Sequence, residues 1–273
     1  MTITLPLNVG LIVAYACNLN CRYCGHFAPF FSKRCAPVVS VEQIEQTCRD
    51  WSNRLRVKNA IVLSGGEALM HPDIESIIKI VGRYWRDKTK MEIFTNGTLL
   101  RDMRPSFFDL LEKWQVTVHI SIHHRRLYDE IKENAKRMRN RYSFWDYTET
   151  QIQEDKISKS RRFVKNYHIV NGKAVLVPAD AKTSYDKCMN KYKCCVFIDG
   201  KLWQCGQIPF TQKAYDYGII EDSAGRIGGC YKPATPDMSD EELQKWWITD
   251  FSASCGVCPN HKPLCPIVEK FIQ

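Results

Sequence analysis

The chain has 273 residues, a formal net charge of +9 at pH 7 and 13 cysteines. This length can bury a large core in one domain, or in one domain with a small second one. No apolar run approaches the roughly 18 residues of a membrane-spanning helix, and the start of the chain lacks the charge pattern and cleavage site of a secretory signal. We therefore expect a cytoplasmic protein with no membrane partner, whose cysteines bind metal rather than form disulfides.

The first predicted strand, residues 9–16, runs directly into a loop with three cysteines. Cys17, Cys21 and Cys24 have the spacing C-x3-C-x2-C. A [4Fe–4S] cube has four irons and usually takes four thiolates, so three thiolates in one loop leave one iron open. An open metal position marks a reactive site. A zinc site or unligated core thiols are the alternatives.

Helical and strand patterns then alternate along the chain. Ser40 is a candidate N-cap for the first helix, with Gln43 three residues later as in a capping box. The alternation predicts βα units and a parallel α/β sheet, whose chemistry lies at the C-terminal ends of the strands. The predicted helices are residues 41–56, 73–85, 105–114 and 127–139, and the predicted strands are residues 60–63, 91–95 and 116–122.

Two short polar motifs follow predicted strands. S-G-G-E stands at residues 64–67, and T-N-G-T stands at residues 95–98. Gly65 and Gly66 permit backbone conformations and a close ligand approach that a Cβ atom would prevent. Glu67 is the only charged side chain in residues 61–70, which makes it a candidate partner for an ammonium group. Each motif alone is also typical of an ordinary turn.

Taken in order, the cysteine loop and these motifs resemble the radical S-adenosylmethionine (radical SAM) enzymes over roughly residues 7–180. The resemblance implies a partial (β/α)6 TIM-like barrel, a [4Fe–4S] cluster and bound SAM. The open iron of the cluster is chelated by the amino and carboxylate groups of SAM. One electron then cleaves SAM to methionine and a 5′-deoxyadenosyl radical, which abstracts a hydrogen atom from the substrate. An oxygen-sensitive enzyme that needs a reductant such as flavodoxin or ferredoxin is implied.

The resemblance also carries individual residues. Tyr23 matches the aromatic residue before the third cysteine. Gly65, Gly66 and Glu67 match the motif that binds the SAM amino group. Asn96 lies near the expected SAM carboxylate and ribose, and Ser121 matches a polar ribose contact in the predicted strand 116–122.

After residue 183 the βα pattern ends, and glycine, proline and cysteine become frequent. The stretch 194–205 predicts a hairpin that turns at Asp199-Gly200. Cysteines gather in two groups around this hairpin and in a later loop, as a second metal site requires, and thiolates alone suit either zinc or iron–sulfur. The first group is Cys188, Cys194, Cys195 and Cys205, and the second is Cys255, Cys258 and Cys265.

This region resembles the SPASM and twitch extensions of radical SAM enzymes. The resemblance implies one auxiliary [4Fe–4S] cluster in a small domain of residues 183–273, after a radical SAM core of residues 1–182. The expected ligands are Cys188, Cys205, Cys255 and Cys258. Cys194 or Cys195 could replace Cys188, and Cys265 could compete. A zinc ribbon is the alternative.

The substrate is the least constrained part of the prediction. The segment 125–165 interleaves basic and aromatic residues, which suits a nucleotide, a modified base or a nucleic acid, but also a solvated helix face. His123 is a candidate acid or base, although a structural histidine is equally compatible, and Cys35 is a weaker catalytic candidate. Peptide-modifying or aminosugar-oxidising enzymes, and a non-catalytic iron–sulfur electron carrier, are the alternatives.

Overall fold

A seven-stranded sheet with the order β11-β10-β2-β4-β5-β6-β7 forms the centre of the molecule. Neighbouring strands pair in parallel, except for β10 and β11. The sheet confirms the predicted α/β class and agrees with a partial (β/α)6 barrel. Its strands are β2 (Val9–Ala14), β4 (Ala60–Gly65), β5 (Lys90–Thr95), β6 (Thr117–Ile122), β7 (Tyr142–Asp146), β10 (Cys195–Ile198) and β11 (Lys201–Trp203).

This computed structural model describes residues 3–5, 7–21, 24–34, 38–123, 125–139, 141–146, 167–188, 191, 193, 195–221 and 231–258. None of the helices in this part of the chain has the length and apolarity needed to cross a membrane.

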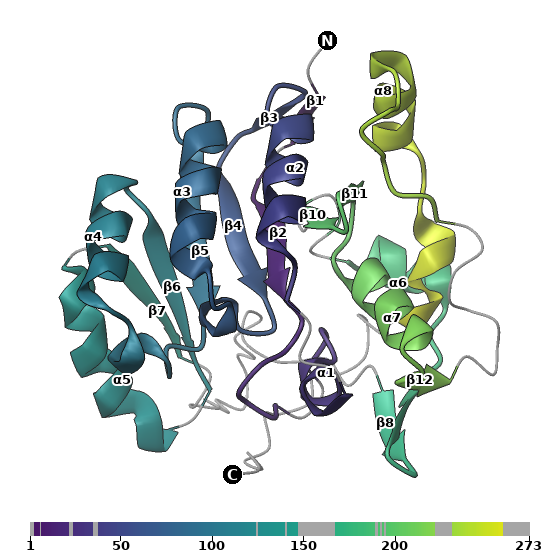
Figure 1. The fold of residues 1–273 in the computed structure, drawn as a ribbon. Helices are drawn as coiled ribbons and strands as arrows, with labels where there is room; N and C mark the ends of the chain where they lie inside the picture. The colour runs from purple at the N-terminus through teal and green to yellow at the C-terminus, as the bar shows by residue number, and fades with distance from the viewer. Residues whose placement is uncertain are drawn as a thin grey trace.

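Amphipathic helices cover one face of the sheet (Figure 1). The burial of α3 shows the principle, because Ile77, Ile78, Val81 and Trp85 all turn inward and are almost completely buried. Such an apolar stripe at helical spacing packs against the apolar face of the sheet. The covering helices are α2 (Val41–Trp51), α3 (Ile74–Trp85), α4 (Pro105–Lys113) and α5 (Tyr128–Ala135).

The first predicted helix was too long. Ser40 caps it as expected, since its side chain accepts a hydrogen bond from the Gln43 N–H at 3.2 Å. The helix ends at Trp51, however, and Leu55–Val57 forms strand β3, which pairs in parallel with β1 (Ile3–Leu5). The fourth helix also ends earlier than predicted, at Ala135, and continues as a short 3-10 turn.

The predicted hairpin is confirmed, and it joins the main sheet. Asp199 and Gly200 have φ values of 51° and 75°, the two positive values of a type I′ turn. Strand β10 then pairs in parallel with β2, with Cys195 opposite Val9. The chain beyond residue 183 therefore returns to the edge of the sheet formed by its first strands.

Smaller elements complete the structure beside β10 and β11 (Figure 1). A three-stranded sheet has the order β12-β9-β8. None of these elements was predicted beyond the hairpin itself. They are α1 (Ala28–Arg34), β8 (Tyr167–Val170), β9 (Lys173–Leu176), α6 (Ala181–Asp186), α7 (Gln207–Asp216), β12 (Ile220–Glu221), α8 (Asp240–Ile248) and the 3-10 helix η5 (Ser252–Val257).

Candidate functional site

The cysteine loop and the S-G-G-E motif meet at the C-terminal ends of β2 and β4. The Gly66 N–H donates to the Ala14 carbonyl at 2.8 Å, and the Glu67 N–H donates to the Ala16 carbonyl at 2.9 Å. Cys17 follows Ala16 directly. The motif is thus hydrogen-bonded to the backbone from which the cysteine loop starts.

Both glycines of the motif are required by this close approach. Gly65 has a φ of +141°, and a Cβ atom there would lie 2.0 Å from the Ala14 carbonyl oxygen. A Cβ atom on Gly66 would lie 2.1 Å from the Ala16 carbonyl oxygen. The space that we attributed to a ligand is therefore first used by the protein's own backbone.

Glu67 is buried, with 1% of its surface exposed. One carboxylate oxygen accepts hydrogen bonds from the Leu69 N–H at 2.9 Å and the Thr95 hydroxyl at 2.7 Å, and the other accepts from the Asn96 N–H at 2.7 Å. Burial raises the pKa of Glu67, and these three donors oppose that shift. Glu67 thus connects the ends of β4 and β5.

Asn96 connects β5 to the cysteine loop. Its side-chain amide donates to the Asn18 side chain at 2.8 Å and lies 3.6 Å from the sulfur of Cys17. The Cys17 backbone N–H in turn donates to the Ser32 hydroxyl of α1 at 2.9 Å. Asn18 and Ser32 were not predicted, because their role depends on contacts between distant segments.

The three thiols lie close enough to influence one another electrostatically. Burial raises the pKa of Cys17 to about 12 and also raises the pKa of Cys21 and Cys24. The sulfur of Cys24 accepts hydrogen bonds from the backbone N–H groups of residues 26, 27 and 28. Thiolates are the ligand form of cysteine, so buried thiols that receive N–H donors but no cation fit a positively charged iron cluster.

The C-terminal part contacts this loop through the start of α7. The Gln207 side chain donates to the Gly25 carbonyl at 3.1 Å. His26 stacks on Phe210 with ring centroids 4.0 Å apart, and its Nδ1 lies 2.7 Å from the Gly65 carbonyl oxygen. His26, which the sequence placed near the site with no defined role, therefore packs between the S-G-G-E motif and α7.

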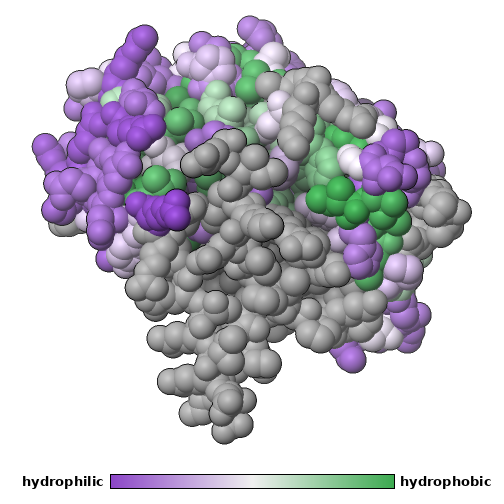
Figure 2. All heavy atoms as spheres, turned by 90° about the horizontal axis from the view of Figure 1, so that it is seen from below, coloured by the Kyte–Doolittle hydropathy of each residue, from purple (hydrophilic) through white to green (hydrophobic). Residues whose placement is uncertain are grey.

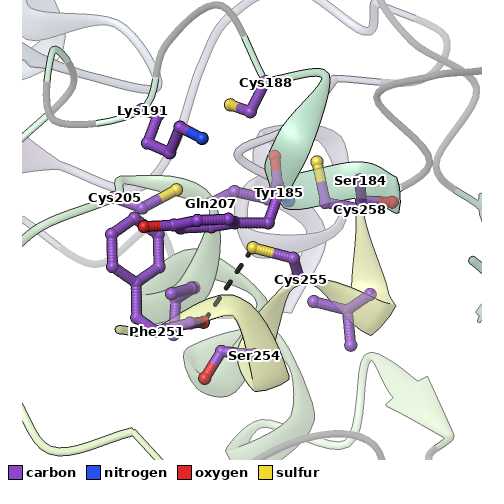
Figure 3. A pocket seen from close by; sticks show the side chains of 12 residues that line it. Ser184, Tyr185, Cys188, Lys191, Cys205, Gln207, Phe251, Ser254, Cys255 and Cys258 are labelled. Atoms are coloured by element: carbon purple, nitrogen blue, oxygen red, sulfur yellow. Dashed lines mark hydrogen bonds between the residues drawn. The ribbon is translucent and has the colours of Figure 1, made fainter. Parts of the chain in front are cut away.

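The four cysteines expected at an auxiliary cluster line one pocket (Figure 3). Cys188 follows α6, Cys205 precedes α7, Cys255 lies in η5 and Cys258 caps it. The pocket encloses about 420 Å³ including its open mouth, and Tyr185 also lines it. Cys195 is buried in β10 and is not among the lining residues.

The chemistry of this pocket also suits an iron–sulfur cluster. Burial raises the pKa of Cys255 to about 12 and raises the pKa of Cys205, whose sulfur accepts hydrogen bonds from the Gln207 and Ile208 N–H groups. Within the described ranges, no three His, Cys, Asp or Glu side chains converge closely enough for a single metal ion. A cube takes one thiolate per iron, so its ligands need not converge on one point.

The remaining predicted residues are placed less completely. Ser121 is partly exposed on β6, and His123 follows that strand directly. Burial lowers the pKa of His123 to about 4. Tyr23, Cys35, Cys194 and Cys265 lie outside the described residues.

The basic segment 125–165 also lies mostly outside the described residues. In its described part, basic side chains contact the protein itself. Arg137 donates to the Leu100 and Met103 carbonyls, and Arg139 pairs with Glu112 at 2.6 Å. Figure 2 views the end of the molecule where the strands terminate, and hydrophilic residues gather there on the side of α4 and α5.

Comparisons with known proteins agree with this site. A family model described as the radical SAM superfamily matches residues 11–150. A search of the curated proteins found no match. Among solved structures, BtrN in complex with AdoMet and 2-DOIA is 14% identical and has a TM-score of 0.54, over 96% of this chain and 90% of that chain. That likeness shows a shared fold.

Two further structures are less similar. The anSMEcpe structure with bound AdoMet and Cp18Cys peptide is 17% identical over 52% of this chain, with a TM-score of 0.40. The matched region spans 42% of the anSMEcpe chain. Streptococcus suis SuiB bound to the precursor peptide SuiA is 13% identical over 93% of this chain and 66% of that chain, with a TM-score of 0.43.

Proposed function

This chain belongs to the radical SAM superfamily, and from that premise we propose that it is a SAM-cleaving enzyme with an auxiliary iron–sulfur cluster. Cys17, Cys21 and Cys24 would hold the first [4Fe–4S] cluster. This cluster, once reduced, supplies the electron that cleaves SAM to a 5′-deoxyadenosyl radical. A reductant such as flavodoxin or ferredoxin is the expected partner.

One observation carries the proposal: the three buried thiols stand next to both strand-end motifs. Cys17 is connected to β5 through Asn96 and begins where the S-G-G-E motif is hydrogen-bonded to β2. Backbone groups at Gly65, Gly66 and Asn96 would orient SAM, with Ser121 on the adjacent strand. Glu67 would act through the two loops that it joins, because its oxygens already accept three hydrogen bonds.

We assign the second cysteine group to the auxiliary cluster. Cys188, Cys205, Cys255 and Cys258 line the same pocket, and the thiols of Cys188, Cys205 and Cys258 each influence that of Cys255 electrostatically. Four thiolates would close this cluster, which favours electron transfer over substrate binding. The SPASM or twitch identity of residues 183–273 is part of this proposal.

Iron content tests the assignment. Reconstituted protein should hold about eight irons per chain, four in each cluster. The variant Cys17→Ala/Cys21→Ala/Cys24→Ala should keep about four of them. If this variant instead retains zinc and no iron, the C-terminal site is a zinc ribbon and the auxiliary cluster does not exist.

A nucleotide or nucleic acid stays a prediction for the substrate. It rests on residues 125–165, and Arg161 and Arg162 are the test residues. Neutralising them should reduce the salt dependence of binding by up to about two phosphate contacts, each worth about 0.7 to 0.9 in the slope of log K against log salt. Binding of single-stranded DNA and RNA across a salt series measures this, and salt-independent binding would exclude it.

A further inference from the structure

The inner face of the sheet, opposite helices α2–α5, is open to solvent along β6. On this strand Val118, Ile120 and Ile122 are fully buried, whereas the residues between them are partly exposed. Ile120 lies on the helix side, because it and Ile131 of α5 both stand next to Gly97. The partly exposed residues, His119 among them, therefore face the interior of the barrel.

Three polar side chains meet on this inner face, on three neighbouring strands. His119 of β6 stands opposite Phe94 on β5 and opposite Ser143 on β7. Its Nε2 lies 3.3 Å from a carboxylate oxygen of Glu92, and its Nδ1 lies 2.5 Å from the Ser143 hydroxyl. The Asn8 side chain also donates to Glu92, at 3.4 Å.

These contacts assign a direction to the protons. A carboxylate only accepts hydrogen bonds, so the Nε2–H of His119 donates to Glu92. Nδ1 then has a free electron pair, and the Ser143 hydroxyl donates to it. A carboxylate, an imidazole and a hydroxyl in this order form the arrangement in which histidine takes up a proton from a hydroxyl group.

The three residues are shielded but accessible. The side chains of His119 and Glu92 are 18% and 11% exposed. Ser121 lies two residues farther along the same face, roughly 7 Å towards the strand end where the cysteine loop lies. A molecule that reached both His119 and the SAM site would have to enter the barrel, which a small compound can do and a polymer strand cannot.

We propose that Glu92, His119 and Ser143 form a proton-accepting site for a hydroxyl or amino group of a small substrate bound inside the barrel. The proton leaves the substrate for the Ser143 oxygen while the Ser143 proton passes to Nδ1 of His119. The Glu92 carboxylate balances the imidazolium charge. The inference rests on the proposed function and names its substrate class.

Deuterium transfer tests the substrate class. The anaerobic holoenzyme with SAM and dithionite is given small-molecule, protein or nucleic-acid fractions from cells grown in deuterated medium. Mass spectrometry of 5′-deoxyadenosine then reports which fraction gives up a hydrogen atom. We expect deuterium from the small-molecule fraction. Transfer only from a polymer fraction, or from none while substrate-free 5′-deoxyadenosine still forms, overturns this inference. If no 5′-deoxyadenosine forms at all, the proposed function fails with it.

Variants test the residues, all compared at equal iron content. Ser143→Ala and His119→Phe should reduce deuterium transfer by about a hundredfold, the lower end of what a positioned acid or base contributes. Ser143→Thr retains the hydroxyl and should restore transfer, and Thr117→Val on the same face should match the native protein. Equal transfer in Ser143→Ala and the native protein, or no recovery in Ser143→Thr, overturns the assignment. If His119→Phe does not fold, the Ser143 pair decides the matter.

Discussion

The backbone N–H of Asn96 donates to the carboxylate of Glu67 at 2.7 Å, in a buried position between two strand ends. Glu67 comes from the β4 motif and Asn96 from the β5 motif, so one carboxylate fixes the distance between them. Asn96 in turn lies 3.6 Å from the Cys17 sulfur. Any shift of the Glu67 carboxylate would therefore reach the cysteine loop through one intervening residue.

Replacement of Glu67 by glutamine should destabilise the protein. The amide keeps the size of the carboxylate but turns an NH₂ group toward at least one of the donors at Leu69, Thr95 or Asn96. A buried donor left without its acceptor costs about 1–3 kcal/mol. Urea denaturation measures the loss, with the exposed Glu112→Gln as control. Equal stability in the two variants would contradict this role.

Gly66→Ala should be more harmful than Gly172→Ala. The new Cβ at residue 66 would lie 2.1 Å from the Ala16 carbonyl oxygen, whereas nothing lies within 4 Å of the Cβ position at residue 172. Gly172→Ala should cost only its left-handed backbone strain, roughly 1–2 kcal/mol. Unfolding free energy and bound iron of both variants check this, and a Gly66→Ala protein with full iron would be the contrary outcome.

Cys21→Ala should abolish substrate-free formation of 5′-deoxyadenosine. The first cluster would lose one of only three protein ligands. Cys48→Ala is the matched control, because Cys48 is also buried but lies in α2, away from the loop. Chromatography after anaerobic incubation with SAM and dithionite measures the product. Unchanged formation in Cys21→Ala would falsify the ligand assignment.

Gln207→Leu should weaken the connection between the C-terminal part and the cysteine loop. It removes the hydrogen bond to the Gly25 carbonyl, and a typical hydrogen bond contributes about 1 kcal/mol of net stability. Gln212→Leu is the control on the same helix, where the exposed side chain bonds only to Asp216 among the described contacts. Anaerobic urea unfolding should show a lower midpoint for Gln207→Leu alone.

His123 should make stability fall in acid. Burial lowers its pKa from 6.5 to about 4, so between these values the unfolded chain binds more protons than the folded one. Stability contributed by neutral His123 is complete above pH 6.5 and is lost as pH falls towards 4. His123→Gln should flatten this decline, and His168→Gln, at an exposed position, should not. Identical pH profiles for the native protein and His123→Gln would contradict the shift.

The sequence predicted those parts of the fold that short-range patterns encode. The strands at residues 60–63 and 91–95 are continuous apolar runs, and Asp199-Gly200 is a turn that few other conformations accept. The cysteine loop and both strand-end motifs were recognisable from their spacing alone. The structure brings Cys17, Gly66, Glu67 and Asn96 together.

What depends on distant partners was missed. Residues 55–57 were assigned to a helix because their pairing with residues 3–5 leaves no local signal. The hydrogen bonds of Glu67 to Thr95 and Asn96 cross between two strand ends, so the carboxylate was expected to face a ligand. His119, Glu92 and Ser143 come together only once the strand register is known.

The pairing of β10 with β2 has a consequence for how the chain folds. Val9 finds its edge partner, Cys195, only after most of the chain has been synthesised. Until then β2 has an open edge in a nascent sheet, and such edges recruit other chains. Contacts between segments so far apart slow folding, and partly folded species with open strand edges aggregate. We expect refolding yield to fall with protein concentration and expression to benefit from low temperature and slow synthesis.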